Sequence, residues 1–466
     1  MRLRTVLILL ILVVGLVAFI ELYEHELPST EERAVLGKRV LGVDELEAQN
    51  LEIAWDENLV RLEADPAPAD RAWRLTEPLA ARADENLVAA LLDGLASLEK
   101  RRTLEDTARA DVGLEPPRLT ATLMTTKGST RLEVGSEVPG SDSMIIAVDG
   151  GNEIFVVENT LWPDLTREPG DWRSRKVFHG GQSDIQRVSL TRGGEEIAVT
   201  RRDKAFWIES PFVDWADSDR VDELLSQLAS MQITSFVDEP GESTAELGLD
   251  PALGELEIDL GEGFEPFRLA WGEVVGAEEN LHFAVADGQL FTTDSELQKF
   301  FDTPVEGWRS LALTSMETFQ IDAMEVFEEG QDELTLTRAG ADWNRGEEEI
   351  SFTSVSELLY AVTGARAQEA MADSGAAISS ESSPEPVLRL VLRGGEMEQT
   401  VAFYRGSDKD VLARVGNRQV GLKVGQNEFT EILDKLGQVR AANSKKTVPD
   451  EQQPADETEL SSDQES

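Results

Sequence analysis

The sequence of 466 residues contains no cysteine and only three histidines, His25, His179 and His282. The absence of cysteine excludes disulfides, Cys-ligated zinc, iron–sulfur clusters, thiol catalysis and lipid attachment at an N-terminal cysteine. With so few imidazole groups, most metal centres and acid–base catalysts based on histidine are hard to assemble. The sequence also lacks the glycine-rich loops that bind nucleotide phosphates, so no nucleotide is expected as a partner.

Positive charge is scarce as well. The chain has 43 Lys and Arg against 90 Asp and Glu, a formal net charge of -47. This field repels phosphate backbones and argues against nucleic-acid binding. Two interpretations of the acidic surface stay open, namely a solvated surface suited to high salt and complementarity to a basic partner. Hydrophobic residues make up 41% of the chain, enough for real cores in about three domains.

A long hydrophobic run occurs only once, from Thr5 to Ile20. As a helix it would rise about 24 Å, slightly less than a hydrocarbon core of roughly 30 Å. Arg2 and Arg4 precede the run and acidic residues follow it, which places the N-terminus in the cytoplasm and the rest outside the inner membrane. No small-x-small site follows, so an uncleaved signal anchor is favoured over a cleaved signal peptide.

Landmarks recur along the rest of the chain at about 135 residues. Trp73 to Pro78 resembles Trp207 to Pro211, so these two tryptophans are predicted to be equivalent, and each element leads into a leucine-rich helix. Leu-Leu pairs lie at 91–92, 224–225 and 358–359, spacings of 133 and 134. Such self-similarity indicates three tandem units.

The second half of each unit carries further landmarks. Gly113 to Pro117 resembles Gly248 to Ala252, and a later glycine follows at Gly135, Gly272 and Gly406. The first two units close with Trp-Arg-Ser, at 172–174 and 308–310. The third unit lacks both the Gly-Leu-acid-Pro motif and the closing tryptophan, and it is therefore predicted to be divergent.

Hydrophobic periodicity predicts the elements of each unit. Segments that start at Asn50, Gln186 and Phe319 alternate apolar and polar residues around a turn, as hairpins do. The leucine-rich segments have helical spacing, and Asp84 and Asp217 are predicted N-caps for two of them. Each unit is expected to follow the order β-β-α-β-β-β-β, with a helix packed on one face of a mainly antiparallel sheet. The predicted fold class is α+β, repeated three times.

The predicted domain organisation follows from these patterns. It is a signal-anchor transmembrane helix at 1–24, a juxtamembrane linker at 25–38, repeat units at 39–180, 181–314 and 315–440, and a disordered acidic tail at 441–466. A Ser/Glu/Pro-rich insertion from Ala372 is predicted to be a loop within the third unit.

The closing Trp-Arg elements supply the candidate partner-binding residues, because exposed Trp-Arg pairs are frequent hot spots. They are Trp172, Arg173, Trp308 and Arg309. In the alternative interpretation each Trp seals the end of a core while its Arg satisfies nearby carbonyls. The pairs recur by internal duplication, which favours this structural alternative.

Other motifs are more simply structural. Gly113 is expected to be a helix-end or turn glycine rather than part of a binding loop. His179 to Gly181 is predicted to be a linker between units one and two. The chain has 90 acidic residues, so some carboxylates will be close by chance and no pair can be nominated as catalytic. No catalytic, cofactor-binding or metal-binding residue is predicted.

Together these motifs resemble a bacterial family known as domain of unknown function 4340. The likeness rests on the N-terminal anchor, Ser29–Arg33, Trp73–Pro78, the leucine-rich helix, Gly113–Pro117 and Asp171–Arg175. It covers about the first 310 residues. The resemblance implies an ABC-type transport system similar to the gliding-motility kind, with a permease and a large exported auxiliary protein as partners. It implies no enzymatic activity and no catalytic residues.

Three hypotheses follow. The first is a non-enzymatic, single-pass protein of the bacterial inner membrane whose periplasmic body is an accessory or scaffold of an ABC-type envelope transport complex. The second is a periplasmic binding module for an envelope polymer or small solute. The third is an envelope hydrolase that uses paired carboxylates, which needs two acids about 5–10 Å apart in a cleft.

Overall fold

The structure is a computed structural model that describes residues 37–41, 48–65, 72–202, 205–239, 241, 243–276, 281–371, 385–406, 410–416 and 418–442. The predicted membrane segment 1–24, most of the linker, the insertion at 372–384 and the tail from residue 443 lie outside these ranges. Among the residues described, no helix is both long and apolar enough to cross a membrane. The chain divides into two compact units, Met1–Lys176 and Val177–Ser466.

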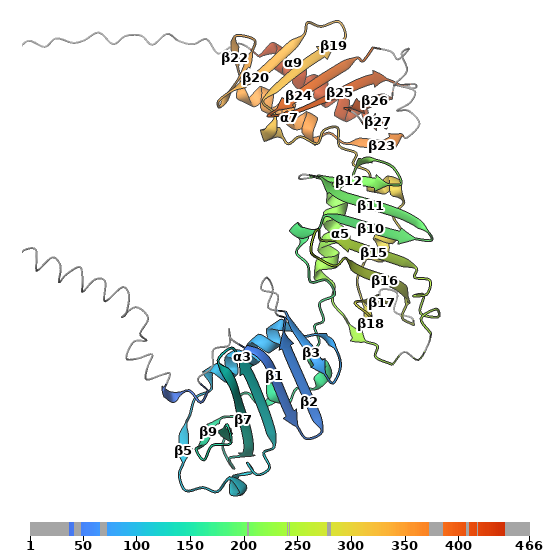
Figure 1. Ribbon diagram of the computed structural model, residues 1–466. Helices are drawn as coiled ribbons and strands as arrows, with labels where there is room; N and C mark the ends of the chain where they lie inside the picture. Colours follow the sequence, from blue (N-terminus) through green and yellow to red (C-terminus); the bar gives the residue numbers. More distant parts are fainter. Residues whose placement is uncertain are drawn as a thin grey trace, which may run out of the picture. The chain divides into compact units, whose positions relative to one another are not determined.

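The described residues form three nine-stranded sheets (Figure 1), and every strand pairing is antiparallel. The first sheet lies in the first compact unit. Its strands are β1 (Ala48–Trp55), β2 (Asn58–Ala64), β3 (Trp73–Glu77), β4 (Ala81–Arg82), β5 (Arg102–Leu104), β6 (Leu119–Thr125), β7 (Gly128–Glu137), β8 (Ser143–Val148) and β9 (Ile154–Glu158). Its helical elements are α3 (Glu85–Ser97), η3 (Arg109–Val112), α4 (Trp162–Leu165) and η4 (Pro169–Trp172).

The strand order in this sheet is β4-β3-β2-β1-β6-β7-β8-β9-β5. Strands β1 to β4 thus form one half of the sheet as a meander, and α3 then leads to β5 at the opposite edge. Strands β6 to β9 form the other half, from β6 beside β1 to β9 beside β5. Leu51 and Ile53 of β1 are buried while Glu52 between them is not, as a half-buried strand requires. Helix α3 buries Leu91 and Leu95, one turn apart, against the sheet.

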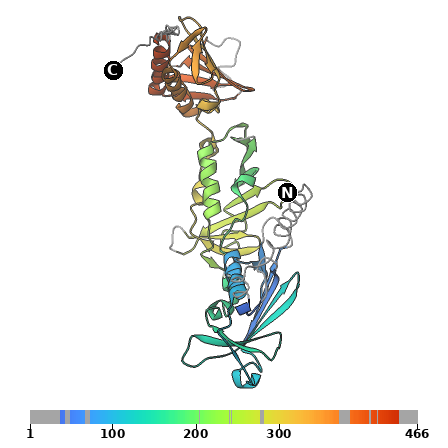
Figure 2. The same cartoon turned by 90° about the vertical axis from the view of Figure 1, so that its left-hand side faces the viewer.

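The second sheet lies in the second compact unit and repeats this order as β13-β12-β11-β10-β15-β16-β17-β18-β14. Its strands are β10 (Arg187–Arg192), β11 (Glu195–Arg202), β12 (Ala205–Ser210), β13 (Asp214–Trp215), β14 (Ser235–Phe236), β15 (Gly254–Asp259), β16 (Phe267–Val274), β17 (His282–Ala286) and β18 (Gln289–Thr293). Its helical elements are η5 (Gln182–Asp184), α5 (Ser218–Ser230), α6 (Gln298–Phe301) and η6 (Val305–Trp308). Figure 2 shows α5, in green, running along one face of this sheet.

The third sheet has the same order, β22-β21-β20-β19-β24-β25-β26-β27-β23. Its strands are β19 (Ala323–Glu328), β20 (Leu334–Ala339), β21 (Asp342–Arg345), β22 (Glu348–Ile350), β23 (Ala367–Met371), β24 (Leu388–Gly394), β25 (Met397–Arg405), β26 (Val411–Val415) and β27 (Gly421–Val424). Its helical elements are η7 (Thr318–Gln320), α7 (Phe352–Gly364) and α9 (Gln426–Ala441).

The three predicted hairpins are confirmed as β1–β2, β10–β11 and β19–β20. Both predicted N-caps are also confirmed. The Asp84 carboxylate accepts hydrogen bonds from the amides of residues 86 and 87, and Asp217 accepts one from that of residue 220. The predicted count of six strands per unit is wrong, because each sheet has nine. The additional strands lie on either side of the main helix along the chain, as β3, β4 and β5 do in the first unit.

The equivalence predicted between Trp73 and Trp207 is wrong by one residue. Leu75 pairs with Leu62 in the first sheet, and Ile208 pairs with Val199 in the second. Two positions before Leu75 lies Trp73, and two positions before Ile208 lies Phe206. Both aromatic side chains are buried. Trp207 is half-buried and packs against the core of the third sheet. This core position is therefore aromatic in both sheets, with tryptophan in the first and phenylalanine in the second.

The glycine landmark fails in the third sheet for a physical reason. A Cβ at Gly135 would lie 2.3 Å from the Val112 carbonyl oxygen, and one at Gly272 would lie 2.4 Å from that of Leu247. These carbonyls belong to the turns that enter the Gly-Leu-acid-Pro motif. Strand registers place Tyr404, not Gly406, at the matching position of the third sheet. Without the motif, no such turn requires a glycine there.

Gly135→Ala is expected to lower the stability of the first compact unit by about 1–3 kcal/mol, because its Cβ would overlap a backbone oxygen. Gly437→Ala is the matched control, since Gly437 lies in α9 and a Cβ there meets nothing within 4 Å. It should gain about 0.5–1 kcal/mol from helix propensity. Urea unfolding of both variants measures the difference, and two substitutions of equal effect would contradict the close approach at Gly135.

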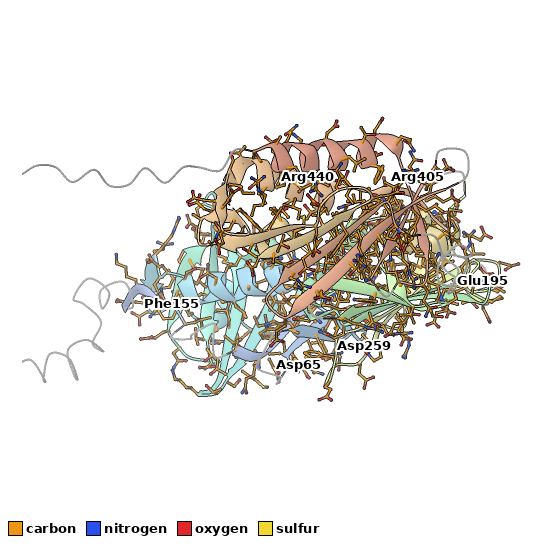
Figure 3. The ribbon with its side chains drawn as sticks, turned by 90° about the horizontal axis from the view of Figure 1, so that it is seen from above. Asp65, Phe155, Glu195, Asp259, Arg405 and Arg440 are labelled. Carbon is orange, nitrogen blue, oxygen red and sulfur yellow. The ribbon has the colours of Figure 1, made fainter. Side chains whose placement is uncertain are left out.

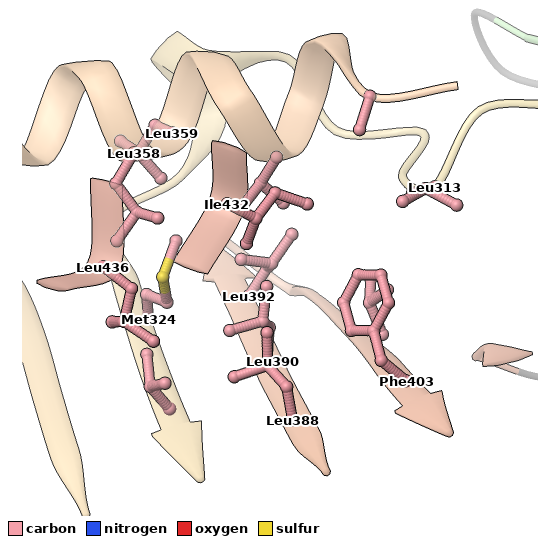
Figure 4. Close-up of a cluster of buried hydrophobic side chains, with 14 of the residues drawn as sticks. Leu313, Met324, Leu358, Leu359, Leu388, Leu390, Leu392, Phe403, Ile432 and Leu436 are labelled. Atoms are coloured by element: carbon pink, nitrogen blue, oxygen red, sulfur yellow. The ribbon is translucent and has the colours of Figure 1, made fainter. Parts of the chain in front are cut away.

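Helix α9 was not predicted, although its spacing was readable. Ile432, Leu436 and Val439 are buried at helical intervals along it. They join a core that includes Leu358 of α7 and Leu390 of β24 (Figure 4). The third sheet is thus covered by two helices, and α9 follows β27 where the first two units have a short helix and the closing Trp turn.

Candidate functional site

The predicted partner-binding residues lie at the ends of η4 and η6. Trp172 and Trp308 are both 0% exposed, and their arginine neighbours Arg173 and Arg309 are buried as well. The Trp172 carbonyl oxygen accepts a hydrogen bond of 2.8 Å from the amide of the N-cap Asp84. The Trp308 carbonyl makes the same bond, also 2.8 Å, with the second N-cap, Asp217. Each closing turn therefore fixes the start of its unit's main helix.

This burial favours the structural interpretation of the Trp-Arg pairs over partner binding. A hot spot must reach its partner, whereas these indole rings lie within hydrophobic cores. The indole N–H groups of Trp172 and Trp308 have no hydrogen-bond partner among the described residues, so their contribution is apolar packing. Trp172 and Trp308 occupy matching positions, as predicted from the Trp-Arg-Ser element.

Arg309 takes part in a buried ionic cluster that the sequence did not reveal. We call Asp214, Arg309 and Arg418 the Asp214 cluster. The Arg418 guanidinium donates to both carboxylate oxygens of Asp214, at 2.7 and 3.1 Å, and both side chains are 1% exposed. Arg418 also donates to the Ser310 carbonyl at 2.7 Å and to the Ala312 carbonyl at 3.2 Å. It thus joins β13 to the segment between the second and third sheets.

The cluster holds two guanidinium groups against one carboxylate. Arg309 Nε lies 3.4 Å from the second carboxylate oxygen of Asp214, and its guanidinium carbon is 3.6 Å from the ring centroid of Phe212. Burial lowers the pKa of the Arg309 guanidinium from its ordinary value, while the Asp214 charge opposes that shift. Asp214 is therefore the charge on which both arginines depend.

Apolar contacts reinforce this connection. Trp215, beside Asp214, is 7% exposed and belongs to the hydrophobic core of the third sheet, with Leu313 and Leu358. The strand registers match Asp214 and Trp215 to Ala81 and Arg82 of the first sheet. That pair supplies neither a carboxylate nor an indole. Asp214 and Trp215, which the second sheet contributes to its coupling with the third, thus have no chemical counterparts in the first sheet.

A pocket of about 690 Å³ lies within the second sheet's unit, between the β10–β11 hairpin, the end of β12 and the segment from α6 to η6. It is lined by Leu190, Arg192, Gly194, Glu195, Glu196, Ile197, Ser210, Pro211, Phe300, Phe301, Asp302, Thr303, Pro304 and Val305. We call it the second-sheet pocket. Its size falls in the usual range for small-molecule sites.

Among the described residues, no group of three or more His, Asp or Glu side chains is arranged to hold a metal ion. His282 is buried, with Nδ1 3.2 Å from the Gly272 carbonyl oxygen and its ring 4.7 Å from that of Trp271. These contacts place His282 in the core of the second sheet. The notable polar features of the second compact unit are therefore the Asp214 cluster and the second-sheet pocket.

Three antiparallel sheets with one strand order define a tandem-repeat protein of mostly β structure. A sequence model described as Domain of unknown function (DUF4340) matches the chain twice, over residues 73–212 and 207–384. These matches span more than half of the chain, which therefore belongs to the DUF4340 family. Their starting points lie close to one repeat length apart, in agreement with the repeated sheets. No curated protein matches the sequence.

Proposed function

We propose that this protein is a non-enzymatic accessory or scaffold subunit of an ABC-type envelope transport complex. In this proposal residues 1–24 anchor it in the inner membrane, and the repeat units at 39–180, 181–314 and 315–440 project into the periplasm. The observation that carries the proposal is the Asp214 cluster, which couples two sheets through charges that are almost fully buried. Such a connection suits a body that holds partners at fixed positions.

The exposed surface offers places where partners could dock. Phe319 is 72% exposed and Tyr360 is 66% exposed. They come from η7 and α7, and these elements are joined by a hydrogen bond of 2.9 Å between the Thr318 and Thr363 hydroxyls. Exposed aromatic side chains are frequent anchors of protein interfaces. The proposed partners are a permease with its ATPase and a large exported auxiliary protein.

Affinity purification of the tagged, full-length protein from crosslinked native membranes tests this function. Mass spectrometry should recover an ABC permease and its ATPase with the wild-type chain. A Phe319→Ser, Tyr360→Ser variant changes only exposed side chains, so it should fold normally while recovering less partner. Recovery of no membrane protein with the wild-type chain would reject the scaffold function.

The second candidate function is a periplasmic binding module for a small solute or an envelope polymer. The second-sheet pocket favours it, because it has the size of a small-molecule site and both apolar and polar residues line it. This function is independent of the transport partners and would survive their absence from the purified material.

A further inference from the structure

The internal repeat supplies a control for the second-sheet pocket. Trp55 pairs with Asn58 at the end of the β1–β2 hairpin, and Arg192 pairs with Glu195 at the end of the β10–β11 hairpin. Trp55 and Arg192 are therefore matching residues. Trp55 is 7% exposed and belongs to the core of the first unit, whereas Arg192 is exposed at the rim of the pocket. An aromatic side chain that completes one core is thus replaced by a charged one in the other.

The floor of the pocket shows the consequence of this exchange. Ile197 corresponds to Val60 by strand register, yet Val60 is fully buried and Ile197 is only partly so. Phe300 and Phe301 of α6 line the same pocket, with Leu190 of β10. Phe301 fits against Gly254, where a Cβ would approach its ring to 2.7 Å. The floor is therefore apolar and packed from below.

The rim carries two carboxylates, of Glu195 and Asp302, and one guanidinium, of Arg192. Arg192 forms an ion pair with Asp302, which also accepts a hydrogen bond of 3.1 Å from Gln298. The Glu196 carboxylate lies on the opposite face of the hairpin, where it accepts hydrogen bonds from Ser189 at 2.6 Å and from Arg187 at 3.0 Å. The Ser189 hydroxyl and then Arg187 lower the pKa of the Glu196 carboxyl, which keeps it ionised.

Glu195 differs from Asp302 because its carboxylate is not neutralised by a cation at this rim. It is exposed at the tip of the β10–β11 hairpin, where Figure 3 labels it, and within the described chain it makes no ion pair. Its counterpart in the first unit is the uncharged Asn58. The rim therefore attracts positive charge, and Glu195 is the group available to meet it.

We propose that the second-sheet pocket binds an amphipathic cation, an apolar ring or short chain that carries an ammonium group. The apolar part lies on Ile197 and Pro304, which line the pocket and are accessible there, and the ammonium group faces Glu195. The proposal rests on the second candidate function, the binding module, and assigns its ligand class. It predicts that the first unit does not bind such a ligand at the corresponding place, because Trp55 is buried there.

Ligand-observed ¹⁹F NMR of the full-length protein tests the proposal. The probes are 4-(trifluoromethyl)benzylammonium, the neutral 4-(trifluoromethyl)benzyl alcohol and the anionic 4-(trifluoromethyl)benzoate. The ammonium probe should bind most tightly and the benzoate most weakly. Arg192→Trp restores the residue of the first unit and should reduce binding of every probe at least tenfold. Arg405→Trp is the control, because it adds the same ring outside the pocket. Arg405 is highly exposed on the third sheet (Figure 3).

Glu195→Gln separates the charge from the cavity and changes an exposed residue that does not support the fold. It should reduce the preference for the ammonium over the alcohol probe about two- to fivefold, the usual range for an exposed charge pair. If Arg192→Trp and Arg405→Trp changed probe binding equally, the second-sheet pocket would not be the binding site. Alcohol and ammonium bound equally by the wild type would overturn the cationic ligand and leave the binding module standing.

Discussion

Asp214→Ala is expected to lower the free energy of unfolding of the Val177–Ser466 unit by about 3–5 kcal/mol. The substitution leaves Arg418, 1% exposed, and Arg309 buried together without the carboxylate that both approach. Removing one member of a buried ion pair costs far more than the net worth of the pair, because the remaining charge is not solvated. Urea unfolding measures the effect when it is monitored by hydrogen exchange in peptides from this unit.

Asp410→Ala is the matched control for this measurement. Asp410 pairs with Lys423 at 2.9 Å in the same compact unit, but their side chains are 41% and 33% exposed. An exposed pair is worth about 0–1 kcal/mol, so this variant should unfold close to the wild type. Exchange should rise most around residues 310–313, where Arg418 holds two carbonyls. An Asp214→Ala variant as stable as Asp410→Ala would contradict a coupling role for the cluster.

Trp172→Ala is expected to destabilise the first compact unit by about 3–5 kcal/mol. Trp172 is 0% exposed in the core of this unit, and its carbonyl bonds the N-cap of α3. The truncation opens a cavity next to that helix start. Trp162→Ala is the control ten residues earlier in the chain, because Trp162 is half-buried and partly covered by Arg118 at 4.7 Å. It should cost roughly 1–2 kcal/mol, in proportion to its smaller buried area.

The same tryptophan distinguishes a structural role from partner binding. Trp172→Phe keeps most of the ring and removes an indole N–H that has no described partner. It should therefore fold and recover the same membrane proteins as the wild type. The structural role would be wrong if Trp172→Ala unfolded at the wild-type urea concentration while it lost its partners.

The features predicted correctly from the sequence are those that neighbouring residues determine. Alternation fixes the hairpins, and an aspartate before an apolar helical pattern fixes the caps at Asp84 and Asp217. Short strands such as β4 and β14 have two residues each, and pairing across the sheet is what makes them strands. Their pattern is too brief to read, so the strand count was too low.

The polar sites depend on residues distant in sequence. Asp214 and Arg418 are 204 positions apart, and neither stands out in a chain with 90 acids and 43 bases. The sequence did contain a sign of the pocket. At the hairpin turn where the first repeat unit has the aromatic Trp55, the second has Arg192 followed by two glycines. Recognising it required the strand register that matches the two hairpins.

Recovery of transport subunits with the tagged full-length chain, measured as stoichiometry after crosslinking of native membranes, is the most direct test of the scaffold function. A scaffold subunit predicts a permease and its ATPase at a fixed ratio to the chain, unchanged in Trp172→Phe and reduced when Phe319 and Tyr360 become serine. A chain recovered without any transport subunit, in a preparation where other membrane complexes stay intact, would contradict it.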